Sequence, residues 1–292
     1  MKEVEEYTTM SKITITMDSV ADLTAELKKQ YNIEQDQVIP TGIVLGGEVL
    51  LDGIEAGPAD VHKAIKEGLS PKTNAPLELD YKAIFEKYTA DGGSVIHVSI
   101  SGALSASLSN AKRAAEGNEN VYFIDSKSLA GGIGHLVLNI KKLIDSGMPV
   151  KEVVAEAEKI RDNMDMSFII KDLKYLHRGG RASSLKLLGA NILKIRPSLY
   201  METDGKLVTG KKYKGDFVSA VKEYVGVKIA ENASNVDRRV IIIQSEQTSS
   251  EVEPMVAEML KAANFEPIVL PAGAAITIHC GYDAIGLSFK RI

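Results

Sequence analysis

The feature that most constrains this fold is the alternation of short apolar runs with longer segments of helical periodicity. Apolar runs at 13–17, 94–100 and 121–124 each end at Ser or Asp and are followed by segments whose apolar residues recur at helical spacing. Parallel sheets that are covered on both faces contain such runs, and crossover helices connect them. The first half of the chain is therefore predicted to be an α/β unit with a mostly parallel sheet flanked by helices.

Other elements of this half are less regular. A strand at 38–45 meets two glycines before another apolar run at 49–51, which suggests a hairpin or an excursion from the sheet. The turn-forming residues at 72–76 are interpreted as a loop that follows a helix. Helices are expected at 59–67, 79–88, 103–116 and 129–145.

The second half mixes hairpin and helix signals. The segment LYMETDGKLVTGKKY alternates on both sides of Asp204-Gly205, which indicates a type I′ hairpin. The mixture predicts an α/β domain with a partly antiparallel sheet. Helices are expected at 150–164, 185–193, 217–233 and 250–263, and strands at 167–170, 240–244, 267–270, 276–279 and 284–289.

A chain of 292 residues exceeds the usual length of one domain, so two domains are expected. We predict a flexible extension at 1–11, an N-terminal domain at 12–160 and a C-terminal domain at 161–292. The proportions of hydrophobic and charged residues, 45% and 25%, are those of an ordinary globular protein.

Charge and cysteine usage exclude several classes of protein. The formal net charge is −4 without a long Lys/Arg run, so nucleic acid is not an expected partner. Cys280 is the only cysteine, which excludes an internal disulfide framework and a multi-cysteine zinc site. The acidic, polar start and the absence of an 18-residue apolar run predict neither a signal peptide nor a membrane span. We therefore expect a cytoplasmic protein.

Familiar nucleotide, metal and hydrolase motifs are incomplete. The segment 205–212 approaches a phosphate-binding loop, but Lys212 replaces the final Ser/Thr and the segment is expected to be a hairpin. Val137 stands where a G-x-G-x-x-G motif needs its last glycine. The five histidines lack metal-ligand spacing, and no serine near a strand end has the G-x-S-x-G pattern. No cofactor and no metal are expected.

Polar corners at the strand ends are the candidate sites. Ser101 lies where a buried strand ends and a helix is expected, so its hydroxyl and the following N–H groups suit a carboxylate or phosphate. For a lone serine at this place a plain helix cap is the more common explanation. Asp18-Ser19 and the segment 125–128 form similar corners, and all three are expected along one edge of the sheet.

Three further groups are candidate binding residues. Thr73 adds a hydroxyl in the loop before Pro76. Arg178 and Arg181, in the RGGR segment, fit a loop that contacts an anion, or a solvated surface loop. His279 ends an apolar run, where a lone histidine is more often a structural residue.

Six segments in order and register give the chain a resemblance to the DegV-like bacterial fatty-acid-binding proteins, from about residue 12 to the C-terminus. The segments are MDSVADL (17–23), PKTNAP (71–76), SISGALSAS (99–107), IDSKSLAGGIG (124–134), LKYLHRGGR (173–181) and ITIHCGYDAIGLSF (276–289). The resemblance implies two α/β domains that enclose one long-chain fatty acid, with the carboxylate at the domain junction and the tail in an apolar tunnel.

The resemblance also implies roles for individual residues. Thr73, Ser101 and the backbone of Gly102 would hold the carboxylate, and His279 would join their hydrogen bonds. Arg178 and Arg181 would match a basic loop implicated in docking to a kinase or in phosphate transfer. The chain departs from the family pattern at Asn74-Ala75, at 104–108 and at 280–283, which affects partner docking and chain preference more than lipid binding.

The function predicted is a non-enzymatic carrier that binds a long-chain fatty acid and presents it to a separate fatty acid kinase. Burial of a sixteen-carbon tail at about 0.8 kcal/mol per methylene supplies on the order of 10 kcal/mol. Tunnel candidates are Ile276, Ile278 and the apolar residues of 185–193, for most of which a helix core is the simpler interpretation. The alternatives are a serine-dependent esterase using Ser101 and His279, or a lipid-responsive regulatory protein. A transient membrane contact is compatible with each.

Overall fold

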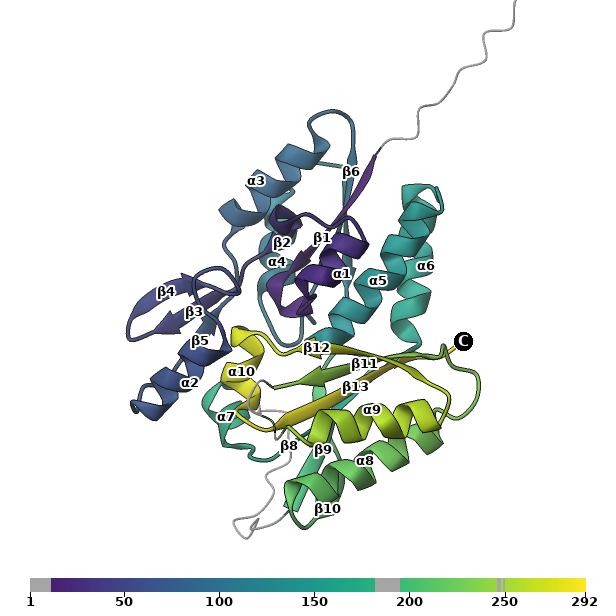
Figure 1. Cartoon of the computed structure of the whole chain (residues 1–292). Helices are drawn as coiled ribbons and strands as arrows, with labels where there is room; N and C mark the ends of the chain where they lie inside the picture. Colours follow the sequence, from purple (N-terminus) through teal and green to yellow (C-terminus); the bar gives the residue numbers. More distant parts are fainter. Residues whose placement is uncertain (1–11, 182–194, 246–247, 249) are drawn as a thin grey trace, which may run out of the picture.

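The computed structural model describes residues 12–181, 195–245, 248 and 250–292. Its first sheet is parallel and has the strand order β2-β1-β6-β7. Val95 of β6 faces a cluster built with α3 and α4, whereas Ile96 and Val98 face the main core. This alternation shows a sheet covered on both faces, with α3 and α4 on one side and α5 and α6 on the other (Figure 1). The strands are β1 (Ile13–Asp18), β2 (Val38–Ile39), β6 (Ser94–Ser99) and β7 (Val121–Asp125).

The helices around this sheet are α1 (Ala25–Gln30), α3 (Glu78–Thr89), α4 (Ser107–Ala114), α5 (Gly131–Asp145) and α6 (Val150–Asp162), with single 3-10 turns η1 (Ser19–Ala21) and η2 (Gln35–Gln37). A small antiparallel sheet, β4-β3-β5, projects from this unit together with α2 (Figure 1). We call it the flap; its elements are β3 (Gly42–Leu45), β4 (Glu48–Leu51), α2 (Pro58–Lys66) and β5 (Lys72–Asn74).

The second sheet has six strands in the order β10-β9-β8-β13-β11-β12, and only β11 and β12 pair in parallel. One face is covered by α8 and α9, as Figure 1 shows. The elements are β8 (Met164–Ile170), α7 (Lys174–Arg178), β9 (Ile195–Met201), β10 (Leu207–Lys214), α8 (Phe217–Glu231), β11 (Arg239–Gln244), α9 (Val252–Ala262), β12 (Glu266–Pro271), α10 (Ala274–Cys280) and β13 (Ala284–Lys290).

The opposite face of the second sheet packs against α5, which joins the two halves. A methyl group at Gly131 would lie 2.6 Å from Cγ1 of Ile243, and one at Gly134 would lie 2.6 Å from the carbonyl oxygen of Ala21. The missing side chains let the start of α5 touch both units. One core cluster consequently runs from Ile15 of β1 to Ala284 of β13.

The predicted fold class, a parallel sheet flanked by helices followed by an α/β unit with a partly antiparallel sheet, is confirmed. The predicted division into 12–160 and 161–292 remains a prediction. Residue 160 lies inside α6, and the main core draws on both sides of it. The segments 1–11 and 185–193 lie outside the described residues.

Four local predictions were wrong. Residues 276–279 are not a strand but belong to α10, because an apolar run buried on all sides does not distinguish a strand from a short helix. The helix expected from residue 103 begins at Ser107, after a turn in which the Leu104 N–H donates to the Ser101 carbonyl. Part of the loop expected at 72–76 is β5, which pairs with β3.

The hairpin at Asp204-Gly205 exists, but its turn is not type I′. That turn needs positive φ at two successive residues, and only Gly205 (φ 80°) has it. The Gly205 N–H donates to the Glu202 carbonyl, and the Glu202 N–H donates to that of Lys206. The loop is therefore a longer turn closed by a glycine bulge.

Candidate ligand-binding cavity

A cavity lies between the two halves, enclosed by the flap, the segment after β6, the second sheet and α10. It contains about 670 Å³ of empty space, part of which opens to solvent. The wall is mostly apolar and includes Val20, Leu104, Leu129, Phe168, Leu207 and Ile276.

The polar part of the wall contains a pair of residues that lie far apart in sequence. Thr73 lies on β5 of the flap, and His279 lies in the last turn of α10. Their Oγ1 and Nε2 atoms are 3.0 Å apart. In the tautomer that carries hydrogen on Nε2, the ring donates to Thr73, and the Thr73 hydroxyl hydrogen is free to point into the cavity.

Burial and the nearby positive charge of Arg181 lower the pKa of His279 to about 4. The ring is therefore neutral at physiological pH. It packs against Gly179, where a methyl group would lie 2.1 Å from Nδ1 of His279. Nδ1 has no hydrogen-bond partner among the described residues. The absence of a side chain at position 179 thus leaves room for the ring.

Two serines that the sequence reasoning did not select also line the cavity. The Ser105 and Ser107 hydroxyl oxygens are 2.9 Å apart, and the Ser107 N–H donates to Ser105 Oγ at 3.2 Å. They lie at the start of α4, where free N–H groups favour an anion. Both lie in the segment SISGALSAS (99–107), whose apolar strand end directs the prediction to Ser101.

Ser101 and Gly102 do not belong to the described lining of this cavity. Ser101 is fully buried, and its hydroxyl donates to the Gly205 carbonyl at 2.7 Å, which ties the β9–β10 hairpin to the first half. The Gly102 N–H donates to Asp125 Oδ1 at 3.3 Å, and Gly102 lines an open groove outside the cavity. The carboxylate-binding role that the resemblance gives them remains a prediction.

The two arginines of RGGR occupy different places. Arg178 is exposed at the end of α7, and Gly180 (φ 71°) turns the chain after it. Arg181 lines both the cavity and the outer groove; its guanidinium donates to the carbonyls of Leu104 at 3.3 Å and Gly179 at 2.8 Å. Arg181 thus reaches the cavity wall, whereas Arg178 does not line the cavity; the roles that the resemblance gives them remain predictions.

Of the two apolar tunnel candidates that the structure describes, Ile276 lines the cavity. Ile278, on the same helix, is buried but is not among the residues that line it. The other candidates, at 185–193, lie outside the described residues.

A buried carboxylate fixes the chain that leads into the polar wall. Asp18 accepts hydrogen bonds from the hydroxyls of Tyr81 and Ser99 and from the Ile100 N–H, at 2.7, 2.8 and 2.9 Å. Burial raises the pKa of Asp18, but hydrogen bonds, first from His97 and then from Tyr81, outweigh this and hold the pKa below its usual value. A charged Asp18 thus anchors the end of β6.

Two further buried carboxyl groups hold the start of α10. Asp22 accepts from the Gly273 N–H at 3.1 Å, and Asp52 accepts from the Ala275 N–H at 3.4 Å and from the Ser19 hydroxyl at 2.7 Å. Burial, and then the charge of Asp52, raise the pKa of Asp22 well above its usual value. These contacts orient the helix that carries His279.

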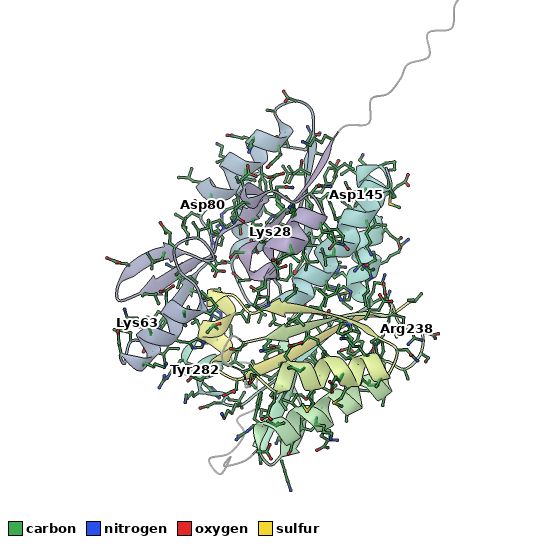
Figure 2. All side chains as sticks on the ribbon, in the orientation of Figure 1. Lys28, Lys63, Asp80, Asp145, Arg238 and Tyr282 are labelled. Carbon is green, nitrogen blue, oxygen red and sulfur yellow. The ribbon has the colours of Figure 1, made fainter. Side chains whose placement is uncertain are left out.

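The flap is joined to the other end of α10. The ring of Tyr282 stacks on His62 of α2 with centroids 4.4 Å apart, and it lies close to α2 in Figure 2. The Tyr282 hydroxyl donates to the His62 carbonyl at 3.4 Å. This contact keeps β5, with Thr73, beside α10.

The part of the chain that the structure describes has no cluster of three or more His, Cys, Asp or Glu side chains suited to a metal ion. Across the same residues, no helix combines the length and apolar character needed to cross a bilayer.

Comparison with known proteins decides the family. The family model described as "Uncharacterised protein, DegV family" matches residues 12–291. The chain belongs to the DegV family. A DegV domain-containing protein of Caldanaerobacter subterraneus is 27% identical over 97% of this chain and all of its own length. One from Clostridium acetobutylicum is 28% identical over 75% of this chain and 77% of its own length.

Solved structures of DegV proteins share the fold. A DegV family protein from Thermus thermophilus, described by its fatty acid binding, superposes with a TM-score of 0.87 at 24% identity, over 96% of this chain and 100% of that one. A Thermotoga maritima protein described as revealing fatty acid binding function has a TM-score of 0.77 at 26% identity, over 97% and 100% of the two chains.

Proposed function

We propose that this DegV chain binds one long-chain fatty acid in the cavity and presents it to a separate kinase, which phosphorylates the carboxylate. The observation that carries the binding proposal is an apolar cavity whose polar wall contains Thr73 hydrogen-bonded to a neutral His279. DegV proteins described as fatty-acid-binding share the fold, which supports it.

The carboxylate is assigned to the group formed by Thr73, Ser105 and Arg181. The two hydroxyls are hydrogen-bond donors, and the Arg181 guanidinium supplies positive charge at the same wall. His279 orients Thr73 through the 3.0 Å hydrogen bond. The earlier assignment of Ser101 would require its hydroxyl to leave the Gly205 carbonyl, so Ser105 is the better candidate.

The tail supplies affinity, since each buried methylene contributes about 0.8 kcal/mol. The polar wall mainly fixes which end of the acid lies at the flap.

The geometry gives no support to the esterase alternative. A serine hydrolase needs its hydroxyl within hydrogen-bond reach of a base. The Ser101 hydroxyl bonds to the Gly205 carbonyl, and His279 Nε2 bonds to Thr73. A carrier without its own chemistry, in the cytoplasm, is the function that we propose.

The kinase step rests on the arginines and on the outer groove. Arg178 is exposed, and the groove beside the cavity contains Gly102, Lys112 and Arg181. A positively charged opening next to the carboxylate suits the approach of a nucleotide-using partner.

Binding is tested with delipidated protein and hexadecanoic acid. The chain has no tryptophan, so displacement of a fluorescent fatty acid is the suitable assay. We expect Thr73→Val to weaken binding by about tenfold, because the buried carboxylate of the fatty acid loses a hydrogen bond. Ser109→Ala, an exposed serine on α4, is the control and should bind as wild type does. Wild-type protein that binds no long-chain acid would disprove the proposal.

The kinase step needs its own assay. Lipid-loaded protein is mixed with ATP and a partner kinase, and acyl phosphate is measured. We expect Arg178→Ala to lower its formation while leaving fatty-acid affinity unchanged. Acyl phosphate made by the purified chain and ATP alone would contradict the carrier role.

A further inference from the structure

A second cavity lies at the junction of the two halves, beside the first. It contains about 780 Å³ of empty space, part of it open to solvent. Three methionines line it: Met164 and Met166 on β8, and Met201 at the end of β9. The register of β8 on β9, with Ser167 opposite Tyr200, places Met166 opposite Met201. Methionine side chains adapt readily to what they contact.

Neighbouring residues line the two cavities and form the partition between them. On β8, Phe168 lines the first cavity and Met166, two residues away on the same face, lines the second. On the hairpin, Leu207 lines the first, and its cross-strand partner Met201 lines the second. Paired residues of this kind have Cβ atoms about 5 Å apart. A third pair consists of two neighbours in the chain: Leu129 lines the first cavity, and Ser128 lines the second.

Ser128 contributes an unused polar group at this partition. The residue is 4% exposed, and its hydroxyl oxygen has no hydrogen-bond partner among the described residues. A methyl group at Gly132 would lie 2.3 Å from that oxygen and 3.1 Å from Cγ of Met166, so the two side chains meet over this glycine. Met166 therefore lies beside the Ser128 hydroxyl at this partition.

The charges around the second cavity balance one another. Lys127 and Arg161 both donate to Asp162, at 3.2 and 2.9 Å, and Glu202 adds a second carboxylate to the lining. A ligand end with a net charge gains little there. A neutral group that both donates and accepts hydrogen bonds fits an unpaired serine.

Building on the proposed function, we propose that the second cavity is the distal end of the acyl-chain site, opened by movement of Met166 and Met201. Ser128 then receives a hydroxyl group at the far end of the chain. The ligand class extends to ω-hydroxy long-chain acids.

The test compares hexadecanoic acid with 16-hydroxyhexadecanoic acid by displacement of a fluorescent fatty acid, and repeats the comparison at neighbouring chain lengths. At one chain length or more, we expect the affinity of wild-type protein for the hydroxy acid to lie within about threefold of its affinity for the plain acid of the same length. Ser128→Ala should weaken the hydroxy acid by about tenfold and leave the plain acid unchanged. Ser109→Ala should alter neither. Thermal unfolding checks that the variants are folded.

Two results would overturn this inference without affecting the proposed function. In the first, every hydroxy acid binds at least about tenfold more weakly than the plain acid of its length, as burial of an unpaired hydroxyl predicts. In the second, Ser128→Ala leaves the ratio of the affinities for the hydroxy acid and the plain acid unchanged. A protein that binds none of the acids overturns the proposed function, and this inference with it. The readouts therefore separate the two failures.

Discussion

At the scale of single residues, the candidate site depends on one side chain that is absent. The His279 ring occupies the space where a Cβ at position 179 would lie, and this fixes its reach to Thr73. Gly179 has an ordinary helical φ of −74°, so glycine is required here because it leaves room for the ring, and not because of its backbone freedom. At the neighbouring Gly180 the reasons are reversed: its φ of 71° favours glycine, whereas a Cβ would meet only open space.

This contrast predicts different effects for two similar variants. Gly179→Ala should displace the His279 ring and weaken fatty-acid binding by about tenfold, since overpacking costs about 1–3 kcal/mol. Gly180→Ala should lower stability by about 1 kcal/mol through backbone strain and leave affinity unchanged. Titration with hexadecanoic acid and thermal unfolding measure the two quantities. Equal affinities for both variants would show that the ring position does not matter.

The sequence located part of this site and missed the rest. Thr73 and His279 were selected because six motifs in register resemble one family, and the cavity contains both. Ser105 was missed because Ser101, at the end of a strong apolar run, looked like the helix start. The actual helix begins six residues later, after a turn in which the Ser101 hydroxyl donates to the docked β9–β10 hairpin. Tertiary contacts of this kind leave no local pattern.

At the scale of elements, α10 shows both the strength and the limit of sequence patterns. Its neighbours β12 and β13 were predicted within about a residue, since each alternates or runs apolar over a strand's length. The sequence of the helix itself predicts a strand, because six of its seven residues are buried and leave no helical periodicity. Its start is fixed by Asp22 and Asp52, which come from the other half of the chain.

The raised pKa of Asp22 gives a prediction with a definite sign. An acid whose folded pKa is raised stabilises the fold at low pH, and this contribution is lost as pH rises through the folded pKa. Asp22→Asn keeps an oxygen for the Gly273 N–H and does not titrate. The variant should therefore raise the melting temperature relative to wild type more at pH 8 than at pH 5. Asp91→Asn, at an exposed position, is the control. A larger gain at pH 5 would reverse the sign and exclude this account.

At the scale of the whole molecule, the two halves are predicted to be separate domains yet share one core. The hairpin tip docks on Ser101, α5 packs on the second sheet, and His135 of α5 lies 3.1 Å from the Ser288 hydroxyl of β13. The sequence predicted the layers on each side because periodicity reports which face of an element is buried. It did not predict the junction, because periodicity does not identify the partner of that face.

The buried histidine at this junction predicts how the whole fold responds to acid. Burial, followed by the positive charge of Arg239, lowers the pKa of His135 to about 3, with Asp237 opposing and Lys290 adding to the effect. The folded state therefore keeps the ring neutral, whereas the unfolded chain binds a proton below about pH 6.5. The contribution of His135 to stability should be level above that pH and fall as the pH drops from about 6.5 towards 3, and His279 acts in the same direction.

The variant His135→Asn separates this contribution from the rest. Asparagine does not titrate, and its amide offers a polar atom towards the Ser288 hydroxyl. Urea unfolding at a series of pH values should show a shallower fall in the free energy of unfolding for the variant than for wild type. Because both proteins keep the same carboxylates and His279, the difference between the two curves reports position 135 alone. Parallel curves would mean that His135 is protonated in the folded protein, and that the junction between the halves admits water.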